Sequence, residues 1–142
     1  MDKIKEMFTD LKDHTTECTQ EEVNNGKLMA VLAYFGLLAL IPYFVEKDNK
    51  YVRFHSIQGL NFYLEGLIAT VGLTVVMFVS MFLFIIPILG WILGGILFIV
   101  SFIGLMAISI GSLVFQIMGI VYAVQGSAKE LPIVNKIKLI KK

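Results

Sequence analysis

One long stretch with almost no ionisable side chains constrains the fold of this chain more than any other feature. Residues 54–125 contain no lysine, arginine or aspartate, and Glu65 is their one acidic residue. Over all 142 residues, 57% are hydrophobic and 16% are charged, whereas soluble domains carry about 25% charged residues. A soluble fold of this size cannot bury so much apolar surface. We therefore predict that lipid surrounds this stretch.

The length of the apolar sequence sets the number of membrane spans that we expect. A spanning helix needs about 20 apolar residues, so residues 54–125 have room for two or three spans, and residues 28–45 supply one more. Pro87 and Gly90 predict a break in the chain near them, between positions 80 and 90.

The final part of the apolar stretch leaves two span counts open. As one helix, residues 91–125 would be about 52 Å long, against about 30 Å of hydrocarbon. We therefore prefer two short spans hinged at residues 101–104. The predicted fold class is all-α, a polytopic integral membrane helical bundle with four spans. The alternative is three spans with a re-entrant or interfacial helix.

The first spanning helix has a recognisable start. Thr19 is followed three residues later by Glu22, which is the pattern of a capping box at a helix N-terminus. We expect this helix to begin near Gln20 and to run to about Val45, with Pro42 bending its last turns.

The two ends of the chain are more polar than its middle. We expect an amphipathic N-terminal segment at residues 1–19, a transmembrane helical domain at residues 20–126 and a basic C-terminal tail at residues 127–142. The lysines of the tail should lie beside anionic lipid on the cytoplasmic side. The formal net charge of +1 gives nucleic acid no electrostatic reason to bind. With Cys18 as its one cysteine, the chain forms no internal disulfide.

Polar side chains share one face of the second predicted helix. At 100° per residue, Gln58, Asn61 and Glu65 fall within about 60° of one another. Glu65 would lie about 16 Å along the helix from Phe54, near the bilayer midplane, where an acid costs on the order of 2.5–3.5 kcal/mol. It should therefore be protonated, hydrogen-bonded or in contact with water. We expect Gln116 to be its first partner.

Two further residues are predicted at the membrane edge of the same helix. The guanidinium of Arg53 can contact lipid phosphate there, and the imidazole of His55 can bond to a headgroup or a loop. The candidate functional polar face is Arg53, His55, Gln58, Asn61, Glu65 and Gln116. Tyr34 and Tyr63 are further candidate partners of Glu65.

Small residues recur along the apolar helices. Gly72 continues the polar face, and the pairs Gly90 with Gly94 and Ala107 with Gly111 have the four-residue spacing that places both on one side of a helix. In lipid, small residues let helix backbones approach closely. We predict that these five positions pack helices together.

Catalytic chemistry has little support in the sequence. No nucleophile can be assembled with a base and an orienting acid, and no glycine-rich phosphate loop follows a strand. His14 and Cys18 have helical i, i+4 spacing but lack the further ligands of a zinc site. We expect no enzyme activity, no metal and no cofactor.

Three segments resemble a known family. They are LAYFGLLALIPYF at residues 32–44, KYVRFHSIQGLNF at residues 50–62 and GSAKELPIVNKIKLIKK at residues 126–142. They are similar to a bacterial membrane-protein family of unknown function that is related to the Tic-type chloroplast protein-import components. The resemblance covers about residues 27–142. It implies an all-helical bundle and a role beside an import channel.

Two functions follow as hypotheses. The first is a non-catalytic multi-pass protein of the bacterial inner (plasma) membrane, an import-component-like scaffold or a subunit of a membrane complex. Its partners would be the lipid bilayer and other membrane proteins or a second copy of the chain. The alternative is a small oligomeric channel or transporter that uses the face of Gln58, Asn61 and Glu65 as a wet pathway.

Overall fold

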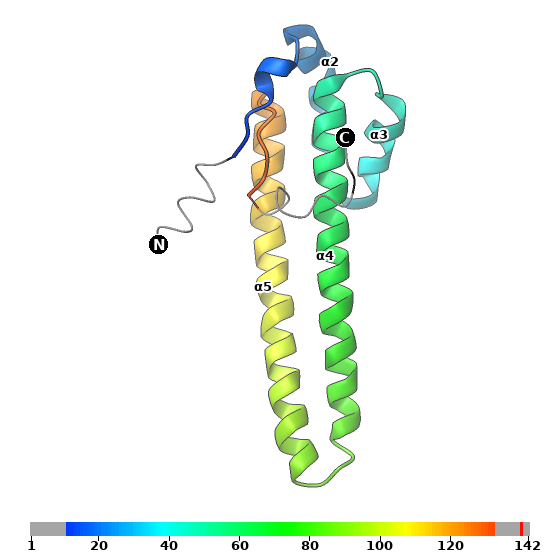
Figure 1. Ribbon diagram of the computed structural model, residues 1–142, viewed down its shortest axis with the longest axis vertical. Helices are drawn as coiled ribbons and strands as arrows, with labels where there is room; N and C mark the ends of the chain where they lie inside the picture. The colour runs from blue at the N-terminus through cyan, green and yellow to red at the C-terminus, as the bar shows by residue number, and fades with distance from the viewer. Residues whose placement is uncertain (1–10, 133–139, 141–142) are drawn as a thin grey trace. The chain divides into compact units, whose positions relative to one another are not determined.

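The computed structural model describes residues 11–132 and residue 140. Along these residues the elements are η1 (Thr15–Glu17), α2 (Gln20–Leu32), η2 (Gly36–Ala39), α3 (Leu40–Val45), α4 (Lys50–Leu83) and α5 (Leu89–Gln125) (Figure 1). The described residues form no β-strand, and their one isolated bridge joins Asp13 and Lys129. The all-α prediction is confirmed. The amphipathic character predicted for the N-terminus falls largely on residues 1–10, outside the described part.

By its contacts the chain divides into two units. The first consists of Met1–Glu65 together with Phe115–Lys142, and the second is Gly66–Val114. The first unit contains η1, α2, η2 and α3, the first turns of α4 and the last turns of α5. The second unit contains the rest of the two long helices and the turn between them.

The start of α2 is as predicted, but its end is not. Thr19 Oγ1 accepts a hydrogen bond from the backbone N–H of Glu22 at 3.2 Å, and Glu22 Oε2 accepts one from the N–H of Thr19 at 2.8 Å. The helix begins at Gln20 and ends at Leu32, so the prediction of one spanning helix from residue 20 to 45 is wrong. The physical reason is Gly36, whose φ of +60° takes the backbone out of the right-handed helix.

The chain after that turn forms a short apolar segment. η2 and α3 together make the apolar stretch Gly36–Val45. This stretch is far shorter than the roughly 20 residues that a spanning helix needs. Several of its large side chains are exposed, including Leu37 at 66% and Phe44 at 59%.

The second unit is a pair of antiparallel helical segments joined by a turn at residues 84–88 (Figure 1). The break predicted between residues 80 and 90 is confirmed. Trp91 Nε1 donates to the carbonyl oxygen of Phe84 at 3.0 Å across this turn. Ile88 has a φ of 64°, a strained conformation for a β-branched residue.

The hinge predicted at residues 101–104 is wrong. α5 continues through these positions as one helix of 37 residues. Ser101 is buried, and a Cβ added to Gly104 would lie 2.9 Å from Leu73 Cδ1. The small residue here therefore gives room to a neighbouring side chain, and it does not bend the helix.

Two helices of the described chain, α4 and α5, are long and apolar enough to cross a membrane. Most of their large apolar side chains outside the first unit are exposed, among them Ile68 at 61% and Phe82 at 68%. The expected four spans are not found in the described residues, because α2 and α3 are both too short.

The core of the first unit combines aromatic rings with very small residues. Tyr51 is fully buried, and Ala30, Ala33, Ala123 and Ala128 have no exposed surface. Alanine at these positions lets backbones approach closely. This close packing positions the polar side chains described next.

Candidate functional site

A buried hydrogen-bonded chain of side chains lies at the centre of the first unit. Gln58 Nε2 donates to the hydroxyl oxygen of Tyr34 at 2.8 Å, and that hydroxyl lies 2.8 Å from His55 Nδ1. Because the hydroxyl oxygen accepts a hydrogen bond from Gln58, the hydroxyl can donate its own hydrogen bond to Nδ1. The geometry therefore favours the neutral His55 tautomer with its proton on Nε2.

Gln58 also binds the segment that follows α5. Its Nε2 donates to the carbonyl oxygen of Lys129 at 3.2 Å, and its Oε1 accepts from the N–H of Leu131 at 3.2 Å. The side-chain amide thus pairs with the backbone as a neighbouring β-strand would. Asn61, one helical turn later, binds the backbone of Ile140.

The N-terminal segment packs against the same C-terminal segment. The N–H of His14 donates to the carbonyl oxygen of Ala128 at 2.9 Å, and the N–H of Glu130 donates to that of Lys12 at 3.2 Å. The imidazole of His14 lies between two carboxylates, with Nδ1 2.8 Å from Glu17 Oε1 and Nε2 3.4 Å from Glu130 Oε1. These contacts join the segment that precedes α2 to the segment that follows α5.

The acidic residue Glu65 does not have the partner that we expected. It is half-buried, and its Oε1 has no hydrogen-bond partner within the described residues. Gln116 is also half-buried, and no hydrogen bond joins the two among those residues. Asn61 makes the last of the described side-chain bonds to the C-terminal segment, and Glu65 lies one turn beyond it.

Arg53 and His55 were expected together at the membrane edge, but they face opposite ways. Arg53 is exposed, whereas His55 has no exposed surface and its ring lies 4.7 Å from that of Tyr51 and 5.3 Å from that of Phe54. The reason is helical geometry, since residues two apart point about 200° apart around a helix. His55 is therefore not placed to contact a lipid headgroup, and its imidazole bonds within the protein, to Tyr34.

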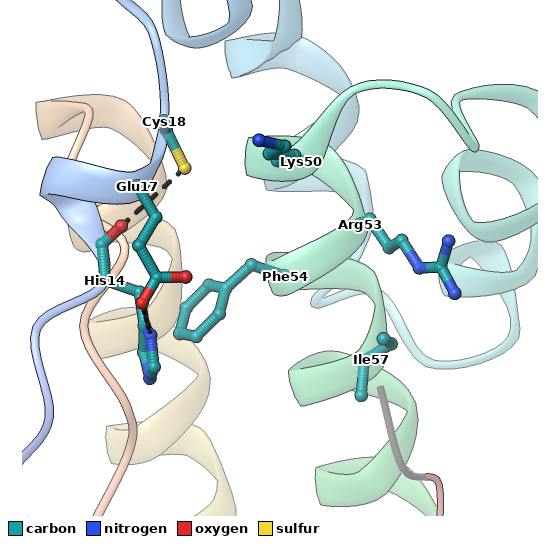
Figure 2. A pocket seen from close by; sticks show the side chains of 7 residues that line it. All are labelled: His14, Glu17, Cys18, Lys50, Arg53, Phe54 and Ile57. Atoms are coloured by element: carbon teal, nitrogen blue, oxygen red, sulfur yellow. Dashed lines mark hydrogen bonds and ion pairs between the residues drawn. The ribbon is translucent and has the colours of Figure 1, made fainter.

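A cavity of about 190 Å³ lies beside these residues in the first unit. Its lining residues are His14, Glu17, Cys18, Lys50, Arg53, Phe54 and Ile57 (Figure 2). Figure 2 shows the ring of Phe54 directed towards His14, and their ring centroids are 5.4 Å apart. The described residues hold no group of three or more histidine, cysteine or acidic side chains placed to bind a metal ion.

The five small residues predicted to pack helices behave in two ways. Gly90 and Gly94 are buried, and a Cβ on either would meet the backbone of α4, at Leu83 and Ser80 respectively. A Cβ on Gly72 or Gly111 would meet nothing within 4 Å. Ala107 is exposed.

Other glycines with close contacts were missed, and Gly59 and Gly119 are two of them. A Cβ on Gly59 would overlap the carbonyl oxygen of Ala33, and a Cβ on Gly119 would overlap the ring of Tyr34. Gly59 adjoins Gln58 in a buried stretch of α4. Because the neighbouring polar residues were already predicted to face protein, the sequence could have indicated a close contact at Gly59.

Comparison with known proteins decides the family. Residues 25–140 match the magnetosome magnetite crystal formation protein family, MamF/MmsF. The chain belongs to this family. The match covers the three segments quoted for the import-component resemblance, apart from the last two residues of the third. That resemblance, and the import-component-like scaffold or subunit inferred from it, are therefore wrong.

Individual MamF/MmsF relatives agree with this assignment. The magnetosome protein MmsF of Paramagnetospirillum magneticum is 32% identical over 109 residues, which are 76% of this chain and 80% of the relative. The magnetosome protein MamF of the same organism is 39% identical over 46 residues, 32% of this chain and 41% of MamF. MamF of Magnetospirillum gryphiswaldense is 37% identical over 46 residues. No solved structure matches the chain.

The channel or transporter hypothesis is also not carried forward. It required Gln58, Asn61 and Glu65 to line a wet pathway. Gln58 and Asn61 are instead 5% and 2% exposed and are bonded to the C-terminal segment.

Proposed function

We propose that this chain is a multi-pass protein of the magnetosome membrane and that it takes part in the formation of magnetite crystals. The observation that carries the proposal is the match of residues 25–140 to the magnetite crystal formation family. The similarity to MmsF over 76% of the chain supports the magnetosome, and not the plasma membrane, as its location.

In the proposed topology α4 and α5 cross the bilayer. Residues 66–83 of α4 are about 27 Å long, close to the roughly 30 Å of hydrocarbon in a bilayer. The exposed apolar side chains of both helices would contact lipid. The shorter stretch Gly36–Val45 would enter the same membrane from one side without crossing it.

Contacts within the first unit support placing both ends of the chain on one side. Tyr51 donates through its hydroxyl to the carbonyl oxygen of Ala123 at 2.6 Å, so the start of α4 and the end of α5 lie together. All 12 lysines and arginines precede residue 54 or follow residue 128. With two spans they all fall on the same side, which the positive-inside tendency makes cytoplasmic. The lysines of the tail would meet anionic lipid there.

We propose further that the protein acts without catalysis. Tyr34, Gln58 and Asn61, the polar groups brought together in the first unit, are bonded to one another or to the C-terminal segment. These bonds join segments of the first unit and so stabilise its fold.

Complementation tests the proposed role. This chain would be expressed in a Paramagnetospirillum magneticum strain that lacks MmsF, next to strains with MmsF restored or with empty vector. Electron microscopy should show crystal sizes shifted from the empty-vector distribution towards the MmsF distribution. A distribution equal to that of empty vector, with the chain present in purified magnetosomes, would contradict the proposal.

Cysteine labelling tests the topology. Cys18 is the one cysteine of the chain, and I86C in a C18S background places a single thiol in the turn. An impermeant maleimide should label the wild-type protein, at Cys18, and the C18S/I86C variant, in the turn, from opposite faces of sealed vesicles. Labelling of both from the same face would exclude two spans.

A further inference from the structure

The turn that joins α4 and α5 in the second unit is made of apolar residues alone. It consists of residues 84–88 (Figure 1), and no hydroxyl, amide or charged side chain occurs anywhere between Ser80 and Ser101. The one side-chain donor in this interval is the indole N–H of Trp91. Turns that lie in water are normally rich in glycine, asparagine, aspartate and serine. The composition of this turn is instead that of the apolar helices on either side of it.

The side chains of the turn point outwards and have little contact with the rest of the second unit. Ile85 is 78% exposed and Ile88 is 70% exposed, and Leu89, the first residue of α5, is 68% exposed. Neighbouring apolar side chains exposed in this way mark a surface that contacts a membrane or another molecule. The turn therefore needs a partner that removes its side chains from water.

The turn satisfies most of its backbone donors internally. The N–H groups of Phe84, Ile85 and Ile86 each donate to the carbonyl oxygen three residues earlier, at 2.9–3.3 Å. Pro87 has no N–H, and its carbonyl oxygen accepts from the N–H of Leu89 at 2.9 Å. Because hydrocarbon solvates no polar group, irregular backbone can approach it only where such groups have partners within the protein. The backbone of the turn largely meets this condition.

Ile88 has an apolar side chain at a position where the backbone favours other residues. Its φ of 64° is strained for a β-branched residue, whereas glycine and asparagine adopt such values readily. In water, this exposed side chain would gain little burial to offset the strain. In lipid, the same side chain is removed from water, which is favourable. The residue at this position therefore favours lipid as the partner.

The length of α4 and the place of Trp91 indicate the depth of the turn. From Gly66 to Leu83, α4 rises about 27 Å, against about 30 Å of hydrocarbon. Trp91 lies against the turn, because its Nε1 donates to the carbonyl oxygen of Phe84 at 3.0 Å. Tryptophan is enriched at the level where hydrocarbon meets lipid headgroups. Both observations place the turn at this level, on the side of the bilayer opposite the lysines and arginines.

We propose that residues 84–88 insert into the far leaflet, at the boundary between hydrocarbon and headgroups, and that phospholipid is their partner. The proposal rests on the membrane placement above and adds that α4 and α5 are joined without an aqueous loop. An effect on crystals would then pass through the membrane or through the first unit. A thiol at residue 86 would still be reached from that face, because the turn lies next to the headgroups.

Trp91 reports on the depth of the turn directly, because it is the one tryptophan of the chain. The full-length protein would be reconstituted in vesicles of phosphatidylcholine that carries bromine either on the acyl carbons near the headgroup or near the chain ends. Bromine near the headgroup should quench the fluorescence of Trp91 more strongly than bromine near the chain ends. Iodide in the buffer should quench it much less than it quenches free N-acetyltryptophanamide.

Matched variants separate insertion of the turn from apolar exposure in general. I85D and L28D each add one carboxylate at a highly exposed apolar position, the first in the turn and the second, 71% exposed, on α2. I85D should draw the turn towards water, so that quenching by bromine falls and quenching by iodide rises. L28D should change neither. I88N serves as a second variant if I85D does not fold by circular dichroism, because asparagine tolerates a positive φ.

Several results would overturn the proposal. Iodide quenching as strong as that of free N-acetyltryptophanamide would place the turn in water. Weak quenching by both bromine and iodide would mean that protein, and not lipid, covers the turn. Strongest quenching by bromine near the chain ends would place the turn in the middle of the bilayer, and equal effects of I85D and L28D would remove the specific role of the turn.

The same experiment distinguishes failure of this proposal from failure of the membrane placement. A protein that does not float with the vesicles in a density gradient would contradict both. A protein that floats with them but gives any of the contrary quenching results would contradict insertion of the turn alone.

Discussion

The side-chain amide of Asn61 pairs with both backbone groups of Ile140. The N–H of Ile140 donates to Asn61 Oδ1 at 2.6 Å, and Asn61 Nδ2 donates to the carbonyl oxygen of Ile140 at 3.0 Å. Gln58, three residues earlier, bonds in the same way to the segment after α5. Two amides on one helix face therefore bind a segment some 70 to 80 residues away in the chain.

Replacing Asn61 should release this end of the chain. N61L keeps the number and branching of the side-chain heavy atoms but removes both hydrogen bonds to the backbone of Ile140. We expect the free energy of unfolding to fall by about 1–3 kcal/mol. Limited trypsin digestion with mass spectrometry should then show faster cleavage at the C-terminal lysines.

The control for this change is N25L. Asn25 is exposed on α2, and substitutions at such sites usually change stability by less than about 0.5 kcal/mol. Equal cleavage rates in N61L and wild type would show that Asn61 does not hold the tail.

Removing the Tyr34 hydroxyl should destabilise the first unit. Y34F leaves the buried Gln58 Nε2 and His55 Nδ1 without the partner that they share. We expect a loss of about 1–3 kcal/mol, measured by thermal unfolding in mild detergent. Y63F is the matched control, because the hydroxyl of Tyr63 has no hydrogen bond within the described residues. A loss as large in Y63F would refute this explanation.

The capping box predicts a dependence of stability on pH. Hydrogen bonds from the backbone of Thr19, and secondarily of Lys50, hold the pKa of Glu22 below its ordinary value of 4.5. A lowered pKa in the folded state means that the ionised carboxylate stabilises the fold. This contribution is complete above pH 4.5, declines as the pH falls and disappears below the lowered pKa.

The E22Q variant tests this dependence. The difference in melting temperature between wild type and E22Q should shrink as the pH falls from neutral through 4.5 and below. E21Q is the control, because Glu21 precedes it on the same helix turn but is not part of the capping box. A difference that stays constant over this range would exclude ionisation of Glu22 as its source.

Local signals in the sequence located the start of α2 and the break before α5. The spacing of Thr19 and Glu22 located the beginning of α2, and Pro87 with Gly90 located the turn before α5. Each depends on residues within a few positions of one another. The end of α2 was missed because glycine adopts negative and positive φ about equally well, so the sequence alone does not show that Gly36 has a positive φ.

The candidate site could be predicted only in part, because its partners are distant in sequence. Helical periodicity correctly placed Gln58 and Asn61 on one face. It could not identify their partners, because pairing with Leu131 or Ile140 depends on how α5 returns towards the start of α4. The family was mistaken for a related reason, since short apolar runs with a few polar residues are common to many membrane proteins.

The contacts of a glycine with distant residues cannot be predicted from the sequence either, and two glycines of α4 differ in these contacts. A Cβ on Gly59 would overlap the carbonyl oxygen of Ala33, whereas a Cβ on Gly66 would meet nothing within 4 Å. G59A forces two backbones apart, at a cost of about 1–3 kcal/mol or more. G66A removes backbone freedom from the unfolded chain and should stabilise by about 0.4–1 kcal/mol.

Thermal unfolding of the two variants in the same detergent measures these opposite effects. The substitutions are chemically identical and lie on one helix, so helix propensity alone would raise the melting temperature of both. A fall for G59A together with a rise for G66A would identify the contact with Ala33 as the deciding factor. A rise for both would mean that α2 does not approach α4 as closely as the structure shows.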